Sequence, residues 1–341
     1  KLEQIKFANG TVWNYATVKT LLPNLINGTT GNDVLTGTAS PDAINGLAGT
    51  DTLSGRDGND ILNGGTGNDT LSGELGSDTY LFNRGDGQDT LNNYDLGSVK
   101  TDTLKFDASV SPTDIAISRS VDDLLLAIKN TTDTVRVLNY FNADGLSVYK
   151  LEKIEFANGT VWDVNTVKSL ALTGGSGSDT LIGYASADKL NGLGGNDVLY
   201  GRDGNDTLDG GAGNDTVSGE LGSDTYLFSR GGGQDTLNNY DTGSSKTDVL
   251  LFAAGIAPVD IAVSRATDDL ILTIKNTTDS VRVLNYFNGD GASIYKLEQI
   301  KFANGTVWDY VTVQGMLLQS IINGTAGNDV LTGTAGPDVI N

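Results

Sequence analysis

Aspartate is the residue of this sequence whose type and spacing best suit chemistry. The chain has 43 acidic residues, and Glu accounts for only six of them, so the acidity is almost entirely Asp. Short Asp side chains suit tight turns and oxygen cages around cations. The chain has no His and no Cys, which excludes imidazole bases, thiolate nucleophiles, disulfides and the usual zinc or copper ligands. A chain that is rich in Asp and has no His or Cys favours the binding of hard cations.

The Asp residues recur in three blocks of nonapeptides, which begin at Gly28, Gly174 and Gly324. The first two blocks run from GTTGNDVLT and GGSGSDTLI to the same closing nonapeptide, GELGSDTYL, and the third holds GTAGNDVLT and GTAGPDVIN. Asp is always in the sixth place, and Leu, Ile, Val or Tyr is always in the eighth. A fixed period of this kind predicts a repeat architecture. The sixth-place residues are Asp33, Asp42, Asp51, Asp60, Asp69, Asp78, Asp179, Asp188, Asp197, Asp206, Asp215, Asp224, Asp329 and Asp338.

Each nonapeptide is predicted to form a six-residue turn followed by a three-residue strand. Gly at the first and fourth places permits positive φ and close approach of backbones. Two nonapeptides then make one coil of 18 residues, and stacked coils make two parallel β-sheets with the turns in two columns. The first column holds Asp33, Asp51 and Asp69, and the second holds Asp42, Asp60 and Asp78. The inward-facing residues are Leu35, Leu53 and Leu71 on one sheet and Ile44, Leu62 and Tyr80 on the other.

The core of such a roll is too thin to stabilise it alone. Roughly 2 kcal/mol for each buried aliphatic side chain does not offset roughly 1.5 kcal/mol of ordering entropy for each of the nine residues. Carboxylates and turn carbonyls together form an all-oxygen environment, which suits Ca²⁺ better than Mg²⁺. A cation between successive coils would take one carboxylate from each, which gives four pairs in each full roll. We therefore expect folding and calcium binding to be one equilibrium.

The pattern GGxGxDxUx, in which U is a large apolar residue, resembles the RTX (haemolysin-type) calcium-binding repeat, which forms a parallel β-roll. The resemblance covers all three blocks. In that family, each calcium ion binds the second- and fourth-place carbonyls and the Asp of one turn. It also binds the first- and third-place carbonyls and the Asp of the turn 18 residues later. One implied site consists of Thr29, Gly31 and Asp33 with Gly46, Ala48 and Asp51, and another of Arg56, Gly58 and Asp60 with Gly73, Leu75 and Asp78.

The resemblance implies further backbone ligands in both complete rolls. In the first roll they are Leu47, Gly49, Gly55, Asp57, Gly64 and Thr66. In the second roll they are Gly175, Gly177, Gly192, Leu193, Gly194, Gly195, Gly201, Arg202, Asp203, Gly204, Gly210, Ala212, Gly219 and Leu221.

Some positions depart from the family pattern. Ser40 and Ser186 replace the fourth-place Gly, so the sites at Asp42/Asp60 and Asp188/Asp206 are less regular than the others. Asp89 and Asp235 follow Asp69 and Asp215 by 20 residues, so they either close the last site of the first column or only end the roll. Asp329 and Asp338 lie in opposite columns, and neither has a partner within the sequence.

The segment that follows each roll has a different character. Residues 102–162 alternate apolar and polar residues in several short runs, which predicts consecutive strands, and Asn158–Gly159 predicts a turn between two of them. Asp163 is a candidate N-cap for a short helix with Val164, Val167 and Leu170 on one face. This segment resembles the haemolysin-type calcium-binding-related domain, which implies a capping and linking role.

The predicted fold is all-β, with tandem parallel β-rolls alternating with small β-rich capping domains. KLEQIKFANGTVW at the start of the chain returns at 296–308, and a close variant lies at 150–162, as expected of a segment of a longer tandem array. The predicted domains are the end of a preceding cap (1–26), roll 1 (27–92), cap 1 (93–172), roll 2 (173–238), cap 2 (239–321) and the start of roll 3 (322–341).

The formal net charge of −21 argues against nucleic acid and anionic membranes as partners and favours cations. No apolar run is long enough to span a membrane. By resemblance, the expected function is that of a non-enzymatic, extracellular, adhesin-like or scaffold region, which a type I secretion system exports and which folds on binding calcium. The alternatives are a calcium-dependent polysaccharide-binding module and an appendage of an enzyme or toxin elsewhere in a parent chain.

Three short features admit other interpretations. Arg84-Gly85-Asp86 spells the RGD adhesion tripeptide, but the second copy has Arg230-Gly231-Gly232, which favours a turn of the roll. The recurring tryptophans favour core packing over sugar stacking; they are Trp13, Trp162 and Trp308. A second aromatic set lies nearer strand ends and is the candidate for polysaccharide binding; it comprises Tyr94, Tyr140, Phe141, Tyr240, Tyr286 and Phe287.

Overall fold

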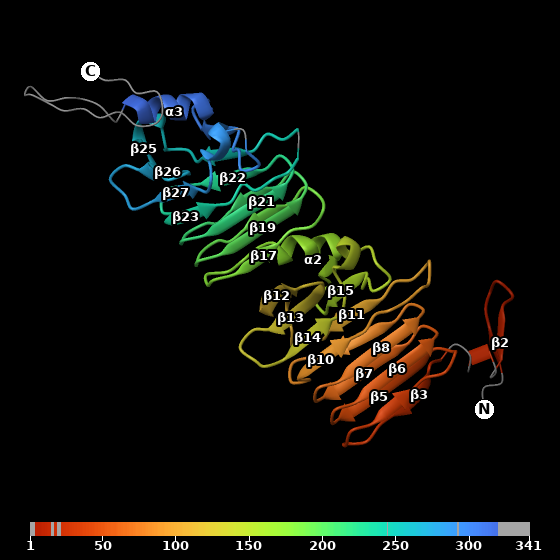
Figure 1. The fold of residues 1–341 in the computed structure, drawn as a ribbon. Coiled ribbons are helices and arrows are strands. Elements are labelled where there is room, and N and C mark those ends of the chain that lie inside the picture. Colours follow the sequence, from red (N-terminus) through yellow and green to blue (C-terminus); the bar gives the residue numbers. More distant parts are fainter. Residues whose placement is uncertain (1–3, 15–16, 19–21, 244, 292, 320–341) are drawn as a thin grey trace, which may run out of the picture. The chain divides into compact units, whose positions relative to one another are not determined.

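The computed structural model describes residues 4–319 except 15–16, 19–21, 244 and 292 (Figure 1). The chain divides into two compact units, Lys1–Leu170 and Ala171–Asn341. The third block of nonapeptides, with Asp329 and Asp338, lies outside the described residues. Ahead of the first roll, β1 (Gln4–Lys6) and β2 (Val12–Asn14) form an antiparallel pair, in which Ile5 lies opposite Trp13.

Two seven-stranded sheets make up most of the first unit (Figure 1). In spatial order, one sheet contains β12 (Ile115–Ser120), β13 (Asp123–Ile128), β14 (Thr134–Val137), β10 (Gln88–Leu91), β8 (Thr70–Leu75), β6 (Thr52–Asp57) and β4 (Val34–Thr36). The other contains β16 (Val161–Asp163), β15 (Lys153–Phe156), β11 (Thr103–Phe106), β9 (Thr79–Phe82), β7 (Ile61–Thr66), β5 (Asp42–Ala48) and β3 (Asn24–Asn27).

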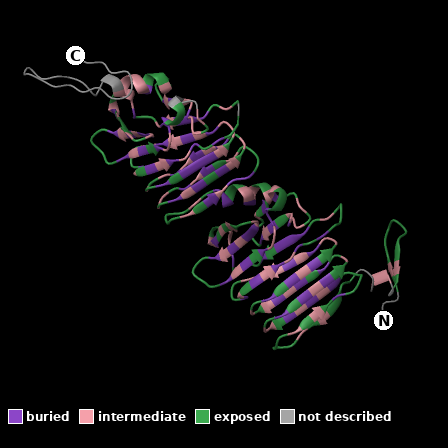
Figure 2. Ribbon diagram, viewed as in Figure 1, coloured by how far each residue is buried: buried purple, intermediate pink, exposed green. Residues whose placement is uncertain are grey.

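The strands of the nonapeptides pair in parallel, with partners 18 residues apart. Leu53 lies opposite both Leu35 and Leu71 in one sheet, and Leu62 lies opposite both Ile44 and Tyr80 in the other. Five of these six inward-facing side chains are at most 1% exposed, and Leu35, in the outermost coil, is half-buried. Buried and exposed residues alternate along the strands (Figure 2). The predicted parallel β-roll with a core one side chain deep is confirmed.

The segment after the roll continues the same two sheets. Strand β14 pairs in parallel with β10, while β11 pairs in parallel with β9 and then with β15. Antiparallel pairing begins only at the outer strands, where β12, β13 and β14 form a meander and β16 returns on β15. Two short 3₁₀ helices interrupt the connections, η1 (Pro112–Asp114) and η2 (Asn142–Gly145). The core of the roll therefore runs without a break into the segment that follows it.

The second unit repeats this arrangement (Figure 1). One sheet has the order β17 (Thr180–Ile182), β19 (Val198–Asp203), β21 (Thr216–Leu221), β23 (Gln234–Leu237), β27 (Ser280–Val283), β26 (Asp269–Ile274) and β25 (Ile261–Ala266). The other has the order β18 (Lys189–Asn191), β20 (Thr207–Asp209), β22 (Thr225–Phe228), β24 (Val249–Phe252), β28 (Gln299–Phe302) and β29 (Val307–Trp308). The 3₁₀ helices are η3 (Pro258–Asp260) and η4 (Asn288–Gly291).

A short helix follows the last strand of each unit's fold, α2 (Val164–Ala171) in the first and α3 (Tyr310–Gln319) in the second. The predicted N-cap of α2 is confirmed, since the Oδ1 atom of Asp163 accepts the backbone N–H of Thr166 at 2.8 Å. Val167 is fully buried, but Leu170 is 37% exposed. Ala171, one residue later, is buried, so the buried side of α2 includes Val167 and Ala171.

Candidate metal centre

The turns of each roll stack their Asp residues into continuous columns. In the first column, the backbone N–H of Asp33 donates to Oδ1 of Asp51, and that of Asp51 to Oδ1 of Asp69, both at 2.7 Å. The second column repeats the contact at 2.8 Å from Asp42 to Asp60 and at 2.9 Å from Asp60 to Asp78. The second roll does the same from Asp179 to Asp215 and from Asp188 to Asp224. One carboxylate oxygen of each inner Asp thus fixes the preceding coil.

The other carboxylate oxygen of the inner Asp residues is buried and has no hydrogen-bond partner. Eight Oδ2 atoms share this state, four in each roll, and each of these residues is at most 1% exposed. They belong to Asp51, Asp60, Asp69, Asp78, Asp197, Asp206, Asp215 and Asp224. A buried carboxylate oxygen without a donor is costly unless a cation compensates it. These eight buried oxygens without hydrogen-bond partners are the observation that makes the turns suitable for holding calcium.

Carbonyl oxygens meet these carboxylates at the first Gly of each turn. A Cβ added to Gly55 would collide with Oδ2 of Asp60 and lie 2.9 Å from the carbonyl oxygen of Gly73, one coil further on. A Cβ on Gly201 would likewise meet Oδ2 of Asp206 and lie 2.7 Å from the carbonyl oxygen of Gly219. These glycines do not have positive φ. First-place Gly is therefore needed for space, because oxygens from two coils converge on its Cα.

Positive φ occurs instead at the second and fourth places of the inner turns. Fourth-place Gly58 has φ +128°, and Gly204 has φ +126°, a region that other residues rarely adopt. Second-place Arg56 has φ 73° although it carries a side chain. Positive φ therefore occurs at alternate places within one turn. Both predicted uses of glycine therefore meet at the fourth place, where a Cβ on Gly67 (φ +144°) would also collide with the carbonyl oxygen of Gly49, whereas the first place needs glycine for space alone.

The third-place carbonyls that the family pattern names are already acceptors of one hydrogen bond each. The N–H groups of Gly49 and Gly58 donate to the carbonyls of Thr66 at 3.0 Å and Leu75 at 2.9 Å. The second roll repeats this with Ala212 and Leu221 as acceptors. A carbonyl has two lone pairs, so each retains one for a cation. The other carbonyl oxygens that are predicted to bind calcium lie in the same turns.

Burial raises the pKa of the carboxyl groups of Asp60, Asp78 and Asp224, and a neighbouring Asp of the same column raises it further. The pKa of Asp60 rises to about 6, and that of Asp78 and of Asp224 to about 7. Desolvation is the largest cause in each case, and the backbone hydrogen bond to Oδ1 opposes it. Without a cation, Asp78 and Asp224 therefore hold a proton up to a pH well above the usual range of Asp.

The outermost turns of each roll differ from the inner ones. The Oδ2 atoms of Asp33 and Asp42 accept the N–H groups of Thr29 and Thr38, both at 2.6 Å. Asp179 and Asp188 accept an N–H from their own turns in the same way. Gly31 has no positive φ here, and neither has Ser40, so the difference follows from the position in the roll rather than from the Ser substitution. Calcium binding at Asp42/Asp60 and Asp188/Asp206, as at the other pairs of the columns, stays a prediction.

The columns extend further than the nonapeptides. Oδ1 of Asp89 accepts the N–H of Asp69 at 2.9 Å despite the 20-residue spacing, and Asp235 does the same for Asp215 at 3.0 Å. Sequence reasoning missed Asp102, whose Oδ1 accepts the N–H of Asp78 at 2.9 Å, and its counterpart Asp248. The signal was available, because a Lys-Thr-Asp tripeptide recurs at 100–102 and 246–248.

Within the part of the chain that the structure describes, no three Asp or Glu side chains gather into a cluster that would hold a metal by itself. The arrangement is instead a linear one, in which two carboxylates from successive coils combine with backbone carbonyls. Hard divalent cations with many oxygen ligands suit such a set.

The structure also bears on the short features noted in the sequence. Asp86 of the RGD tripeptide is 8% exposed, and its Oδ2 atom accepts the N–H of Asn83 at 2.7 Å, so it serves the turn. Trp162 and Trp308 are buried and contact Phe156 and Phe302 edge-on. Of the second aromatic set, four members are buried, and only Tyr94 and Tyr240 are exposed, at 43% and 45%.

Comparisons with known proteins match both kinds of segment. The family model of the RTX calcium-binding nonapeptide repeat matches residues 27–62, 54–91, 172–199, 191–226 and 321–341. The model of the haemolysin-type calcium binding protein related domain matches 123–166 and 269–312. RTX nonapeptide repeats bind several calcium ions. None of the described helices is both long and apolar enough to cross a membrane.

Over 106 residues the chain is 38% identical to the iron-regulated protein FrpA of Neisseria meningitidis serogroup C, and the match covers 31% of this chain and 10% of that protein. The chain thus matches about a tenth of the length of this relative. Among solved structures, the extracellular lipase LipA of Serratia marcescens aligns at 20% identity over 81% of this chain and 39% of its own, with a TM-score of 0.23. With its rolls and its intervening segments matching these two family models, the chain belongs to the RTX, or haemolysin-type, calcium-binding repeat proteins.

Proposed function

We propose that this chain is a calcium-dependent folding region of a secreted bacterial protein and serves as an extracellular adhesin-like or scaffold array. The observation that carries the proposal is the set of eight buried Oδ2 atoms without partners, which recur coil after coil in both rolls. No neutral donor completes them, whereas a divalent cation compensates two carboxylates at once.

The proposed sites lie between Asp residues that follow each other in one column. In the first roll the pairs are Asp33/Asp51, Asp51/Asp69, Asp42/Asp60 and Asp60/Asp78, with Asp69/Asp89 as a fifth. In the second roll the corresponding pairs are Asp179/Asp197, Asp197/Asp215, Asp188/Asp206, Asp206/Asp224 and Asp215/Asp235. The turn carbonyls named by the family pattern would complete each coordination shell.

The electrostatics support folding outside the cell. The net charge is −21, and the columns place Asp carboxylates next to each other, so the ionised members repel each other until cations are bound. Where calcium is scarce, the chain would stay unfolded and suit a type I secretion system. Where calcium is abundant, binding and folding would proceed together. We assign no catalytic role to this region, and an enzyme or toxin in another part of a parent protein is the alternative for which it would act as an appendage.

Circular dichroism of the full chain during a calcium titration tests the proposal. We expect the β signal to rise with calcium and to disappear on addition of a chelator. A β signal that is unchanged by the chelator would overturn the proposal.

A second candidate function is calcium-dependent binding of polysaccharide. It rests on one aromatic pair at the same place in each unit, in which an exposed tyrosine lies beside a half-buried one: Tyr94 lies 5.3 Å from Tyr149, and Tyr240 lies 5.5 Å from Tyr295, between ring centroids. Exposed aromatic rings are platforms for ligand stacking. A glycan array with and without chelator discriminates the two functions, because a scaffold alone binds no glycan in either condition.

A further inference from the structure

The second Asp column of each unit continues beyond the roll into the segment that follows it. After Asp78 donates its N–H to Oδ1 of Asp102, the N–H of Asp102 donates to Oε2 of Glu152 at 2.8 Å. The second unit has the same chain of contacts through Asp224, Asp248 and Glu298. Asp102 therefore stands where the next calcium-binding carboxylate of the column would stand.

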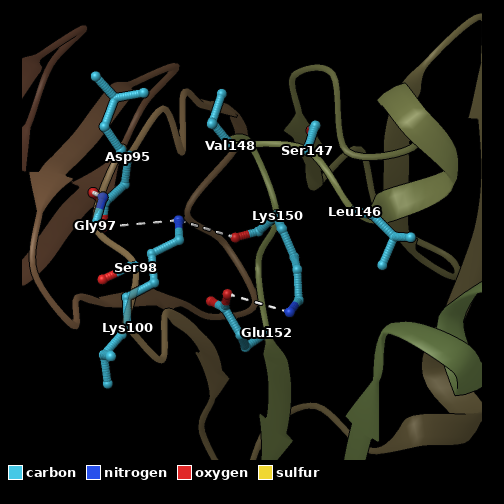
Figure 3. A pocket seen from close by; sticks show the side chains of 11 residues that line it. Asp95, Gly97, Ser98, Lys100, Leu146, Ser147, Val148, Lys150 and Glu152 are labelled. Carbon is cyan, nitrogen blue, oxygen red and sulfur yellow. Dashed lines mark hydrogen bonds and ion pairs between the residues drawn. The ribbon is translucent and has the colours of Figure 1, made fainter.

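Asp102 differs from the roll residues in the partner of its second oxygen. Its Oδ2 atom accepts the ammonium Nζ of Lys100 at 2.8 Å and the side-chain amide of Asn93 at 2.9 Å. Nζ of Lys100 also lies 3.8 Å from Oδ2 of Asp95 and 3.3 Å from the carbonyl oxygen of Lys150 (Figure 3). The side chains of Lys100, Asp95 and Asp102 are 8%, 1% and 0% exposed. The ammonium thus lies among two carboxylates, a side-chain amide and a backbone carbonyl.

The same arrangement recurs in the second unit. Nζ of Lys246 lies 2.8 Å from Oδ2 of Asp248 and 3.9 Å from Oδ2 of Asp241, and its side chain is also 8% exposed. Asn239 donates its amide to Asp248 at 2.8 Å. Two copies with matching distances indicate a built site rather than a chance surface pair.

The first column has no such ending among the contacts of the described residues. Asp89 closes it, with Asp86 and Asp133 as the charged groups that act on it, and both are acidic. A tethered cation therefore stands at the end of only one column in each unit. A general need for surface charge would not explain why the lysine lies at the end of this column and not of the other.

We infer that Lys100 and Lys246 act as tethered cations that take the place of the next calcium ion, and so end the second calcium column of each roll at Asp78 and Asp224. The ammonium compensates Asp102 or Asp248 without metal and fills the space in which a divalent ion would lie. The segment that follows the roll is then charge-balanced at any calcium concentration, while the roll is not. This inference rests on the proposed calcium columns.

A solvent-open cavity of about 450 Å³ borders Lys100 and is lined in part by Asp95, Lys150 and Glu152 (Figure 3). The corresponding cavity of the second unit, about 360 Å³, borders Lys246. A cation from solvent therefore reaches the lysine, Asp95 and Glu152, while Asp102 lies behind the lysine and is not part of the cavity lining. The lysine, and not a lack of access, keeps calcium out.

The test is calcium stoichiometry by native mass spectrometry, together with the midpoint of the calcium-induced circular dichroism change, on the full chain. Lys100→Ala removes the ammonium and leaves space, so we expect one additional calcium ion per chain. Lys100→Met removes the charge but fills the space, so we expect no additional ion and a midpoint at least about tenfold higher, because Asp102 is left buried and unpaired. Lys105→Ala is the control, since Lys105 forms an exposed ion pair with Glu155.

A double variant keeps the test decisive if a single variant folds poorly. Lys100→Ala with Asp102→Asn removes both charges and retains the Oδ1 acceptor for Asp78, so we expect the wild-type calcium count and a midpoint near that of the wild type. A wild-type calcium count together with a wild-type midpoint in both single variants would overturn the inference. A double variant that binds the same additional calcium ion as Lys100→Ala would also overturn it. If the wild-type chain itself shows no calcium response, the proposed function fails, and the inference fails with it.

Discussion

At the scale of single residues, the sixth-place Asp has two different tasks, one for each carboxylate oxygen. Oδ1 accepts a backbone N–H from the preceding coil, as in the 2.9 Å contact between Asp60 and Asp78, and Oδ2 is left for a cation. Asn would preserve the first task and lose the second. Asp→Asn variants therefore separate the geometry of the roll from its calcium chemistry.

The number of calcium ions lost should depend on the position of the Asp in its column. Asp60→Asn is expected to remove two ions, because Asp60 serves both the Asp42 and the Asp78 pair, whereas Asp33→Asn should remove one. Native mass spectrometry at saturating calcium measures the count. Asp57→Asn is the matched control, because Asp57 lies in the same turn with an exposed side chain, and the variant retains the backbone carbonyl that the family pattern names. Equal losses for Asp60→Asn and Asp33→Asn would contradict the column arrangement.

First-place Gly should be intolerant of a methyl group. In Gly201→Ala, the added Cβ collides with Oδ2 of Asp206, so we expect calcium affinity at that turn to fall by about tenfold or more. Gly315→Ala is the control, because Gly315 lies in α3, no atom lies within 4 Å of its added Cβ and its φ is not positive. Isothermal titration calorimetry compares the two. Similar affinities would show that the first-place cradle is not part of the site.

At the scale of elements, the Asp columns make the stability of the roll depend on pH. Without calcium, stability should fall as pH rises, whereas calcium affinity should rise. Without calcium, the pKa of Asp78 and Asp224 is about 7 in the folded roll, and that of Asp89 is about 8, against an ordinary value of 3.8. The folded roll then binds more protons than the unfolded chain, so this contribution to stability is complete below pH 3.8 and is lost as pH rises through 7 to 8.

In the presence of chelator, we therefore expect more β signal at pH 5 than at pH 8. Calcium competes with these protons, so calcium affinity should rise over the same interval, and binding at pH 7 should release protons. Calorimetry in buffers of different ionisation enthalpy measures the release. Binding heats that do not depend on the buffer would contradict it.

The sequence was sufficient to predict the roll because a strict nonapeptide period fixes the turn, the column and the inward-facing side chain together. Leu53 and Leu62 needed only their place in the period to be assigned to opposite sheets. The extension of the columns was not predictable in this way, since Asp102 lies 24 residues after Asp78 and Glu152 a further 50. Those connections have no period, and only the paired backbones of β9, β11 and β15 bring the residues into line.

At the scale of the whole molecule, the net charge of −21 leads us to expect that compactness, like local order, depends on calcium. Eight orphaned oxygens are distributed over both units, so each unit should need its own calcium. Small monovalent ions would screen the repulsion between the Asp carboxylates without occupying the calcium positions in the turns.

We expect calcium, but not magnesium at the same concentration, to reduce the hydrodynamic radius of the chain. Mg²⁺ gives up its water ligands reluctantly and demands octahedral geometry, which these turns of two carboxylates and several carbonyls do not offer. Dynamic light scattering at constant ionic strength makes the comparison. An equal contraction with magnesium would show that simple charge neutralisation is sufficient.

The parallel stacking of coils has a consequence for how the molecule responds to its surroundings. Each coil contacts only the coil before it and the coil after it, and the outermost coil, with half-buried Leu35 and the hydrogen-bonded Asp33, has a neighbour on one side only. The opposite end is continuous with the sheets of the following segment. Ordering should therefore advance from that end outward, as in other one-dimensional repeat arrays. The number of ordered coils then becomes a graded measure of free calcium, which lets the length of the rigid part vary with the surroundings.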